Sequence, residues 1–357
     1  MTKLHLSVSP PVAVTGLAVN ERLAPAIHAA QAERNQALDF TKGALVLVMV
    51  FYHWLNYFVG LQLEIYRYLR FLTPSFILIT GFIVSSVYLR KRNNDAALYR
   101  RLWVRGAKLL LLFTALNVAV SAATTQNYNG APLGLTAFTS NLYGVYVRGD
   151  GRAAFDILVP IAYFLLFLPA ILAMTRRWSP TPVALAAIGL TLSFVAGRDG
   201  AIGPNVELLS FAMLGMAIGT LPLGFIERAG RQPTFVFLAY VLYLAALTVW
   251  NVVLPVQVAG VCLSLLVLYL VGDGWGEESR MKRHVIELGK YSLLAYIGQV
   301  VVLQVLRRGL QNFTLTGVEL AIPLALTFAL TGAAVELTAA TRRRVPVFDR
   351  VYRAVFA

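Results

Sequence analysis

Long apolar stretches alternate with short clusters of charged residues along most of the chain. Ten such stretches lie at residues 38–60, 68–89, 106–124, 153–175, 181–197, 205–226, 233–251, 253–271, 288–306 and 317–340. An α-helix needs about 20 residues to cross roughly 30 Å of hydrocarbon. The apolar residues surround each predicted helix instead of alternating along a strand, which favours helices over a β-barrel. The pattern predicts an all-α fold, a polytopic integral membrane helical bundle of about ten transmembrane helices.

The basic residues gather on one side of this predicted membrane. The sequence has 31 lysines and arginines against 17 acidic residues, a net charge of +14. With the N-terminus inside, the inner loops and termini hold 24 of the basic residues and the outer loops only 7. Cytoplasmic loops are usually rich in Lys and Arg, so both termini are predicted to be cytoplasmic. This topology accounts for the basic balance without nucleic acid as a partner.

Three regions follow from these patterns. Residues 1–37 are predicted to be a cytoplasmic tail, part of which could lie on the membrane as an interfacial helix. Residues 38–340 form the ten-helix domain, and residues 341–357 form a basic cytoplasmic tail. The outer loop 125–152 is rich in amides and tyrosines, which suits either a sugar-like ligand or an ordinary solvated loop. One cysteine and four histidines exclude a disulfide framework, and no metal site is predicted.

The first apolar stretch carries polar residues at membrane depth, where they are costly. Eleven residues separate Lys42 from His53, which is about three helical turns and a rise of roughly 16 Å. Both side chains therefore face one way, and Asn56 shares their face. His53 is the only histidine within a predicted span, and an imidazole can accept a proton from a hydroxyl near neutral pH. His53 is a candidate general base, although a lone helical histidine is commonly a packing residue.

Four segments occur in an order that is similar to a known family. They are Leu38-Asp39-x-x-Lys42-Gly43 followed by His53, Phe76–Phe82 with Thr80-Gly81, the arginine cluster Tyr99–Arg105, and Leu288–Tyr296 with Gly289. Together they resemble the membrane-bound acyltransferase-3 family, whose relatives include glucan succinyltransferases and heparan acetyltransferases. Two positions depart from the family pattern: Lys42 stands where arginine is usual, and Gln299 stands where histidine is frequent. A glutamine cannot act as an acid or base, so no second catalytic histidine lies there.

The resemblance implies an acyl-CoA-dependent O-acyltransferase, with acetyl or succinyl as the acyl group. The donor is a cytoplasmic acyl-CoA co-substrate, no cofactor is tightly bound, and the acceptor is a hydroxyl of an extracytoplasmic polysaccharide or glycolipid. His53 is then the catalytic residue, as a general base or through a covalent acyl-histidine. The donor-binding cations are Lys42, Arg101 and Arg105. The acceptor or the carbonyl oxygen is held by candidates on two helices: Asn56, Ser292, Tyr296 and Gln299. A bacterial inner membrane is the expected location, in contact with membrane lipid.

Each assignment has a competing interpretation. Arg101 and Arg105 could be topology signals alone, and the polar residues of the ninth stretch could serve hydrogen bonding between helices. Lys42 could simply pair with Asp39, one turn earlier. Gly215 and Gly219 form a small-x-x-x-small pair that predicts close helix packing. A polar line through a helical bundle also suits a transporter or flippase of an envelope glycan or lipid precursor, which is the principal alternative.

Overall fold

A computed structural model describes residues 35–60, 63–89, 96–123, 135–149, 154–197, 202–221, 232–250, 253–275, 279–313 and 316–356. Within these ranges every regular element is a helix. The chain divides into residues 1–36 and residues 37–357, and the description below concerns the second unit. Residues 1–34, which hold most of the predicted N-terminal tail, lie outside the described residues, as do residues 125–134 and 150–152 of the predicted outer loop.

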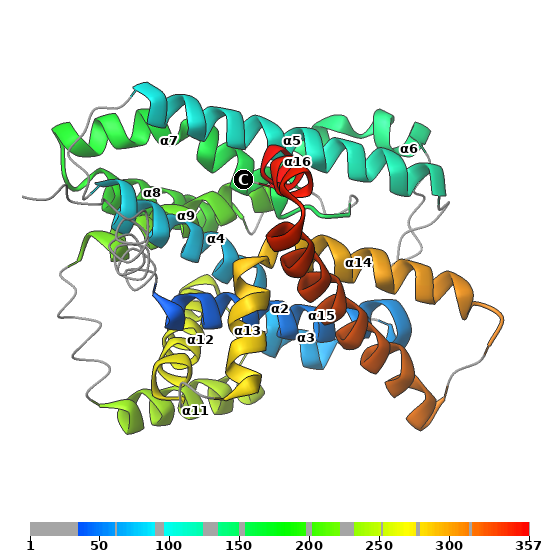
Figure 1. Cartoon of the computed structure of the whole chain (residues 1–357). Helices are drawn as coiled ribbons and strands as arrows, with labels where there is room; N and C mark the ends of the chain where they lie inside the picture. Colours follow the sequence, from blue (N-terminus) through cyan, green and yellow to red (C-terminus); the bar gives the residue numbers. More distant parts are fainter. Residues whose placement is uncertain are drawn as a thin grey trace, which may run out of the picture. The chain divides into compact units, whose positions relative to one another are not determined.

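Figure 1 shows the helices in their order along the chain. The first half comprises α2 (Gln36–Trp54), the π-helix η1 (Leu55–Val59), α3 (Leu63–Leu69), α4 (Leu72–Val84), the π-helix η2 (Ser85–Leu89), α5 (Ala96–Ala123), α6 (Leu135–Ser140), the π-helix η3 (Tyr143–Arg148), α7 (Leu158–Arg177) and α8 (Thr181–Ala196). The second half comprises α9 (Pro204–Thr220), α11 (Pro233–Val249), α12 (Leu254–Gly274), α13 (Arg280–Lys290), α14 (Ser292–Gly309), the 3-10 helix η4 (Gly317–Leu320), α15 (Ala321–Arg344) and α16 (Pro346–Phe356).

Several of these helices meet the requirements of a membrane span. Within the described residues, six helical segments are long and apolar enough to cross a bilayer, namely Gln36–Val59, Glu64–Val84, Ala96–Ala122, Leu158–Arg177, Leu254–Gly274 and Gly317–Arg344. The count rises to seven if α13 and α14, bent by 91°, form one span. The apolar helices α8 and α11 have only 16 and 17 residues. The chain is therefore an all-α, multi-pass membrane protein, as the hydrophobic pattern predicts.

Three predicted stretches differ most from the observed helices. The stretch 68–89 begins within α3 and continues through α4 and η2. The third helix starts at Ala96 instead of residue 106, because the arginine-bearing segment before it continues the same helix. The stretch 288–306 is divided at Tyr291, where the chain turns between α13 and α14. Leu288 and Gly289 thus end one helix and Ser292 begins the next. In the predicted basic tail, residues 341–344 end α15 and residues 346–356 form the helix α16.

The core is built on close helix contacts that glycines allow. Gly81 of α4 and Gly215 of α9 lie at the crossing of these helices, where an added Cβ would be 2.9 Å from the carbonyl carbon of Ala212 or 2.8 Å from that of Leu78. Because a helix approaching that closely leaves no room for a side chain, the predicted small-residue packing at Gly215 and Gly219 is confirmed. Around this crossing lie fully buried aromatic rings such as Phe113, Phe164 and Phe211.

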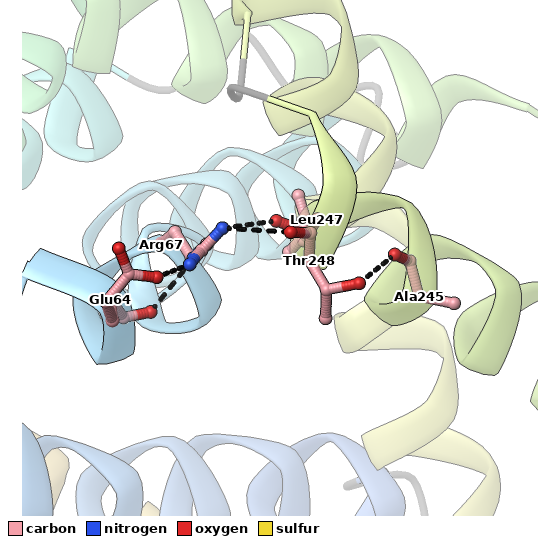
Figure 2. A network of polar contacts seen from close by, with 5 residues as sticks. All are labelled: Glu64, Arg67, Ala245, Leu247 and Thr248. Atoms are coloured by element: carbon pink, nitrogen blue, oxygen red, sulfur yellow. Dashed lines mark hydrogen bonds and ion pairs between the residues drawn. The ribbon is translucent and has the colours of Figure 1, made fainter.

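A short polar network fixes α3 beside α11 (Figure 2). Arg67 of α3 forms an ion pair with Glu64 and donates hydrogen bonds from Nη1 to the backbone oxygens of Leu247, at 3.1 Å, and Thr248, at 3.3 Å. These carbonyls lie at the C-terminal end of α11, where the last backbone oxygens of a helix lack partners within the helix. One guanidinium therefore closes the end of α11 and holds α3 in place.

Candidate active site

His53 lies near the end of α2, directly before the helix changes character. Residues 55–59 continue as a π-helix that ends at Gly60, whose φ of 91° favours glycine. Single π-helical turns within longer helices are frequent at functional sites. The buried Nδ1 atom of His53 has no hydrogen-bond partner in the structure. Because buried polar atoms are nearly always paired, this ring nitrogen is available to a ligand or a reacting proton.

Two glycines from separate sequence motifs bring α2 against α13. A Cβ on Gly43 would lie 2.8 Å from the carbonyl carbon of Val285 and 3.0 Å from the nitrogen of Gly289. A Cβ on Gly289 would lie 2.7 Å from the carbonyl carbon of Asp39. The two helices therefore cross backbone to backbone, next to Lys42. Since α14 follows α13 after one turn residue, this crossing determines where α14 begins relative to α2.

The helix α14 runs beside α2 and η1 in the same direction. The ring of Tyr296 lies 6.3 Å from that of His53 between centroids, and Gln304 donates a 3.2 Å hydrogen bond to the hydroxyl of Tyr57. Gln299 lies on α14 between these two levels, as Asn56 does on η1. Of the predicted acceptor or oxyanion candidates, Tyr296 is thus brought beside the histidine, and Gln299 lies about one turn further along α14.

Gln299 is the most unusual polar residue of the site. Its side chain is 0% exposed, and neither the oxygen nor the nitrogen of its amide has a hydrogen-bond partner. The amide nitrogen of Asn56 is likewise buried and without a partner, while its oxygen accepts a hydrogen bond from Tyr66. A buried amide without partners costs a few kcal/mol. A ligand-binding site contains polar groups that find their hydrogen-bond partners only when the ligand binds, and these amide atoms and the His53 nitrogen meet that description.

Aromatic rings surround these groups. Tyr52 lies 5.2 Å from His53 and 5.6 Å from Tyr66 between ring centroids, and Phe155 meets Tyr296 edge to face at 5.9 Å. The hydroxyl of Tyr66 also donates to the oxygen of Gly60 at 3.2 Å. Rings of this kind exclude water and provide flat apolar surfaces with polar edges.

The turn that carries Phe155 is strained and firmly anchored. Among the described residues Phe155 is the one non-glycine residue with a positive φ, 60°, a conformation that bulky side chains rarely adopt. Asn117 of α5, 0% exposed, holds the preceding residue Ala154 from both sides: its oxygen accepts from the Ala154 nitrogen and its amide donates to the Ala154 oxygen, each at 2.9 Å. Strained residues persist where their surroundings fix them, and they gather at functional sites.

The predicted donor-binding cations are not assembled in the same way. Lys42 forms a 2.6 Å ion pair with Asp39, whose side chain is only 4% exposed, so the competing interpretation of Lys42 has direct geometric support. Arg101 and Arg105 are exposed on α5, which packs mainly against α7. Ser292 is half-buried at the first residue of α14. Within the described residues, no group of three or more His, Cys, Asp or Glu side chains could hold a metal ion.

Sequence reasoning missed Tyr52, Tyr66, Asn117 and Phe155. Asn117 carries the same signal that identified His53, a polar residue inside an apolar stretch. The position of Phe155 has no such signal, because its conformation follows from contacts with two other helices.

These features define a multi-pass membrane protein with a buried histidine among unpartnered amides, an arrangement suited to proton transfer and to binding of a polar oxygen. Comparison with protein families identifies it further: the model of the acyltransferase-3 family, described as an acyltransferase domain, matches residues 35–337. The chain therefore belongs to the acyltransferase-3 family and carries an acyltransferase domain. A search of curated proteins found no significant match.

Proposed function

We propose that this protein transfers an acetyl or succinyl group from a cytoplasmic acyl-CoA to a hydroxyl of an extracytoplasmic polysaccharide or glycolipid, with His53 as the general base. The observation that carries the proposal is the unpartnered Nδ1 atom of His53, together with the unpartnered amide nitrogen of Asn56 on the adjoining π-helix and the unpartnered amide of Gln299 on α14. In a member of an acyltransferase family, a proton acceptor and hydrogen-bond donors on neighbouring helices are the groups that acyl transfer needs.

The reaction assigns a separate task to each group. His53 takes the proton from the acceptor hydroxyl, whose oxygen forms the new bond to the acyl carbon. The amide nitrogen of Gln299 or Asn56 donates to the carbonyl oxygen as its negative charge develops, a contribution typically worth about 10²- to 10³-fold in rate. The carbon–sulfur bond then breaks, and the CoA thiolate takes up the proton from His53. Donor and acceptor are consumed stoichiometrically, and the enzyme is regenerated.

The donor's phosphates require cations at the cytoplasmic face. Arg101 and Arg105 are exposed and one turn apart at the start of α5, which suits contact with a large anionic ligand. The proposal places ten spans in a bacterial inner membrane, with both termini cytoplasmic: α2, α4, α5, α7, α8, α9, α11, α12, α14 and α15. The parallel course of α2 and α14 supports it, since both would then run outward.

The test is the rate of CoA release from acetyl-CoA by purified protein that is supplied with an envelope polysaccharide or glycolipid extract as acceptor, followed through the free thiol. His53→Ala should lower this rate by roughly 10²- to 10⁴-fold, the usual contribution of a positioned base. Ser193→Ala is the matched control, because the Ser193 hydroxyl is also buried and unpartnered but belongs to α8, which contributes no residue to the site. If His53→Ala keeps more than half of the wild-type rate, the histidine is a packing residue and the mechanism is wrong.

The transporter alternative makes a different prediction in the same preparation. Radiolabelled acetyl-CoA should leave its label covalently attached to an acceptor if the protein is a transferase. Label that crosses a proteoliposome membrane without any transfer or CoA release would instead favour a transporter or flippase.

A further inference from the structure

The helix α16 presents three distinct faces. Asp349, Tyr352 and Phe356, spaced by three and four residues, turn toward the rest of the protein. A second face is apolar and exposed, with Val347 at 60% and Val351 at 57% exposure, together with Phe348 and Val355. The third face carries the exposed residues Arg350 and Arg353. An apolar face without a protein partner, beside a basic face, is the pattern of a helix that lies in a membrane interface.

The inner face of α16 is attached by a polar and aromatic network. Arg342 of α15 donates from Nε to Asp349 at 2.7 Å and lies 4.1 Å above the ring of Tyr352. Its Nη1 donates to the hydroxyl of Tyr291 at 3.2 Å, and Phe356 stacks on Tyr352 at 4.9 Å. These contacts fix the rotation of α16 about its own axis. Its apolar face therefore points away from the rest of the protein.

The charge around α16 indicates which surface covers that face. From Arg342 to Phe356 the chain has five arginines, Arg342, Arg343, Arg344, Arg350 and Arg353, and one acidic residue, Asp349, which is already paired with two of them. The helix also follows the candidate span α15 after the single residue Val345. A bilayer surface with anionic headgroups offers both an apolar layer and negative charge at this position.

We propose that α16 docks on the membrane leaflet from which α15 emerges, with its valine face among the acyl chains and its arginines among anionic phospholipid headgroups. The docking also affects the active site, because Arg342 connects α16 to Tyr291, the turn residue between α13 and α14. The helix that carries Tyr296 and Gln299 begins at the next residue. This second step rests on the proposed function, whereas the docking itself does not.

The experiment uses the full-length protein in nanodiscs with a fluorescent label on α16. Cys262, the lone cysteine of the chain, is replaced in Cys262→Ser, and an environment-sensitive nitrobenzoxadiazole is attached at Val351→Cys or, as the matched control, at Arg350→Cys. Bilayers contain phosphatidylcholine alone or with about one third phosphatidylglycerol, enough for a strong negative surface potential.

With phosphatidylglycerol present, the label at position 351 should be quenched by lipid-borne spin labels at least about two-fold more than the label at 350, and aqueous iodide should quench it less. The double variant Arg343→Gln, Arg344→Gln should weaken the effect of phosphatidylglycerol, whereas Arg308→Gln at the other end of α14 should not. Equal iodide quenching at 350 and 351 in both bilayers would overturn the proposal. Protection from iodide without quenching by lipid would also overturn it, since the face would then be covered by protein. Loss of CoA release in His53→Ala leaves these outcomes unchanged, so the docking and the proposed reaction are tested separately.

Discussion

Replacing Gly43 with alanine probes how the active site is positioned. The backbone of α2 at this residue lies against the backbone of α13, so the added methyl group would meet main-chain atoms and not flexible side chains. Carbon atoms prefer separations of about 3.5–4.0 Å, yet the new Cβ would be 2.8 Å from the carbonyl carbon of Val285. No change of side-chain rotamer can relieve this overlap. One helix must move away by roughly 1 Å.

The displacement is expected to change both the stability of the protein and its turnover rate. Inserting a methyl group into a closely packed contact costs about 1–3 kcal/mol of stability. A 1 Å error in the placement of reacting groups can lower turnover about 100-fold. Because α13 leads through Tyr291 into α14, the shift changes the distance between Tyr296 and His53. Gly43→Ala should therefore lower the rate of CoA release by about 10- to 100-fold, although the methyl group touches no reacting atom.

Gly332→Ala supplies the matched control. A Cβ at Gly332, in the middle of α15, has nothing within 4 Å, and alanine is preferred over glycine in a helix by roughly 0.5–1 kcal/mol. The two substitutions are chemically identical but should shift the thermal unfolding temperature of the purified protein in opposite directions. If both variants unfold at or above the wild-type temperature and retain its rate of CoA release, the backbone crossing does not position the site.

Four further predictions concern single residues. Gln299→Leu should lower CoA release at least about 10-fold while leaving the unfolding temperature unchanged or higher, because it removes a buried amide without partners; a lower unfolding temperature with full activity would contradict this. Phe155→Gly should lower activity more than stability, since glycine accepts the φ of 60° but loses the ring beside Tyr296. The Phe155→Ala variant should unfold at a lower temperature than the Phe155→Gly variant, because alanine does not accept this φ as readily. Equal unfolding temperatures of the two variants would exclude backbone strain at this turn. If Lys42 binds the donor, Lys42→Gln should raise the KM for acetyl-CoA and Lys42→Arg should not, whereas a simple pair with Asp39 would leave both values at that of the wild type. Arg353 and Arg342 hold the pKa of Asp349 below its usual value. This carboxylate therefore stabilises α16 above the ordinary aspartate pKa and loses that effect as the pH falls through its lowered pKa. The hydrogen-exchange protection of α16, measured relative to the intrinsic exchange rate at each pH, should stay constant from pH 8 to about 5 and fall only in stronger acid.

The hydrophobic pattern was sufficient to predict the fold class, because each apolar stretch is a local property of the chain. The residues at which helices begin and end were harder to predict. The predicted apolar stretch begins at residue 106 because the residues before it include several arginines. The helix nevertheless extends back to Ala96, because these arginines can reach water from one side of the helix. The break at Tyr291 depends on the crossing of α2 with α13, a contact between segments more than 200 residues apart. No local pattern encodes such a contact.

The site residues likewise differ in whether the sequence could identify them. His53, Tyr296 and Gln299 could be selected from the sequence because polar residues are rare within apolar stretches. The structure brings Tyr296 beside His53 and places Gln299 between this contact and the one from Gln304 to Tyr57. Phe155 could not be selected from the sequence, since its role depends on Asn117 in another helix and on a φ that no sequence pattern specifies. The role of the motif glycines becomes clear only from the contacts between helices in the structure. Gly43 and Gly289 belong to separate motifs, and each explains the other at the crossing of α2 and α13.

The pairing of Lys42 with Asp39 changes what the first motif can do. A donor phosphate that approached Lys42 would have to share its ammonium with a carboxylate 2.6 Å away, and the two anions would repel each other. An arginine could serve both at once, because its planar group presents separate edges to two acceptors. Lysine offers one compact charge, which Asp39 already uses. The Asp39–Lys42 pair is therefore better suited to fix the start of α2 beside Gly289 than to bind the donor alone. If the donor is an acyl-CoA, as proposed, other cations must supply most of the attraction for its phosphates, and Arg101 and Arg105 are exposed on α5.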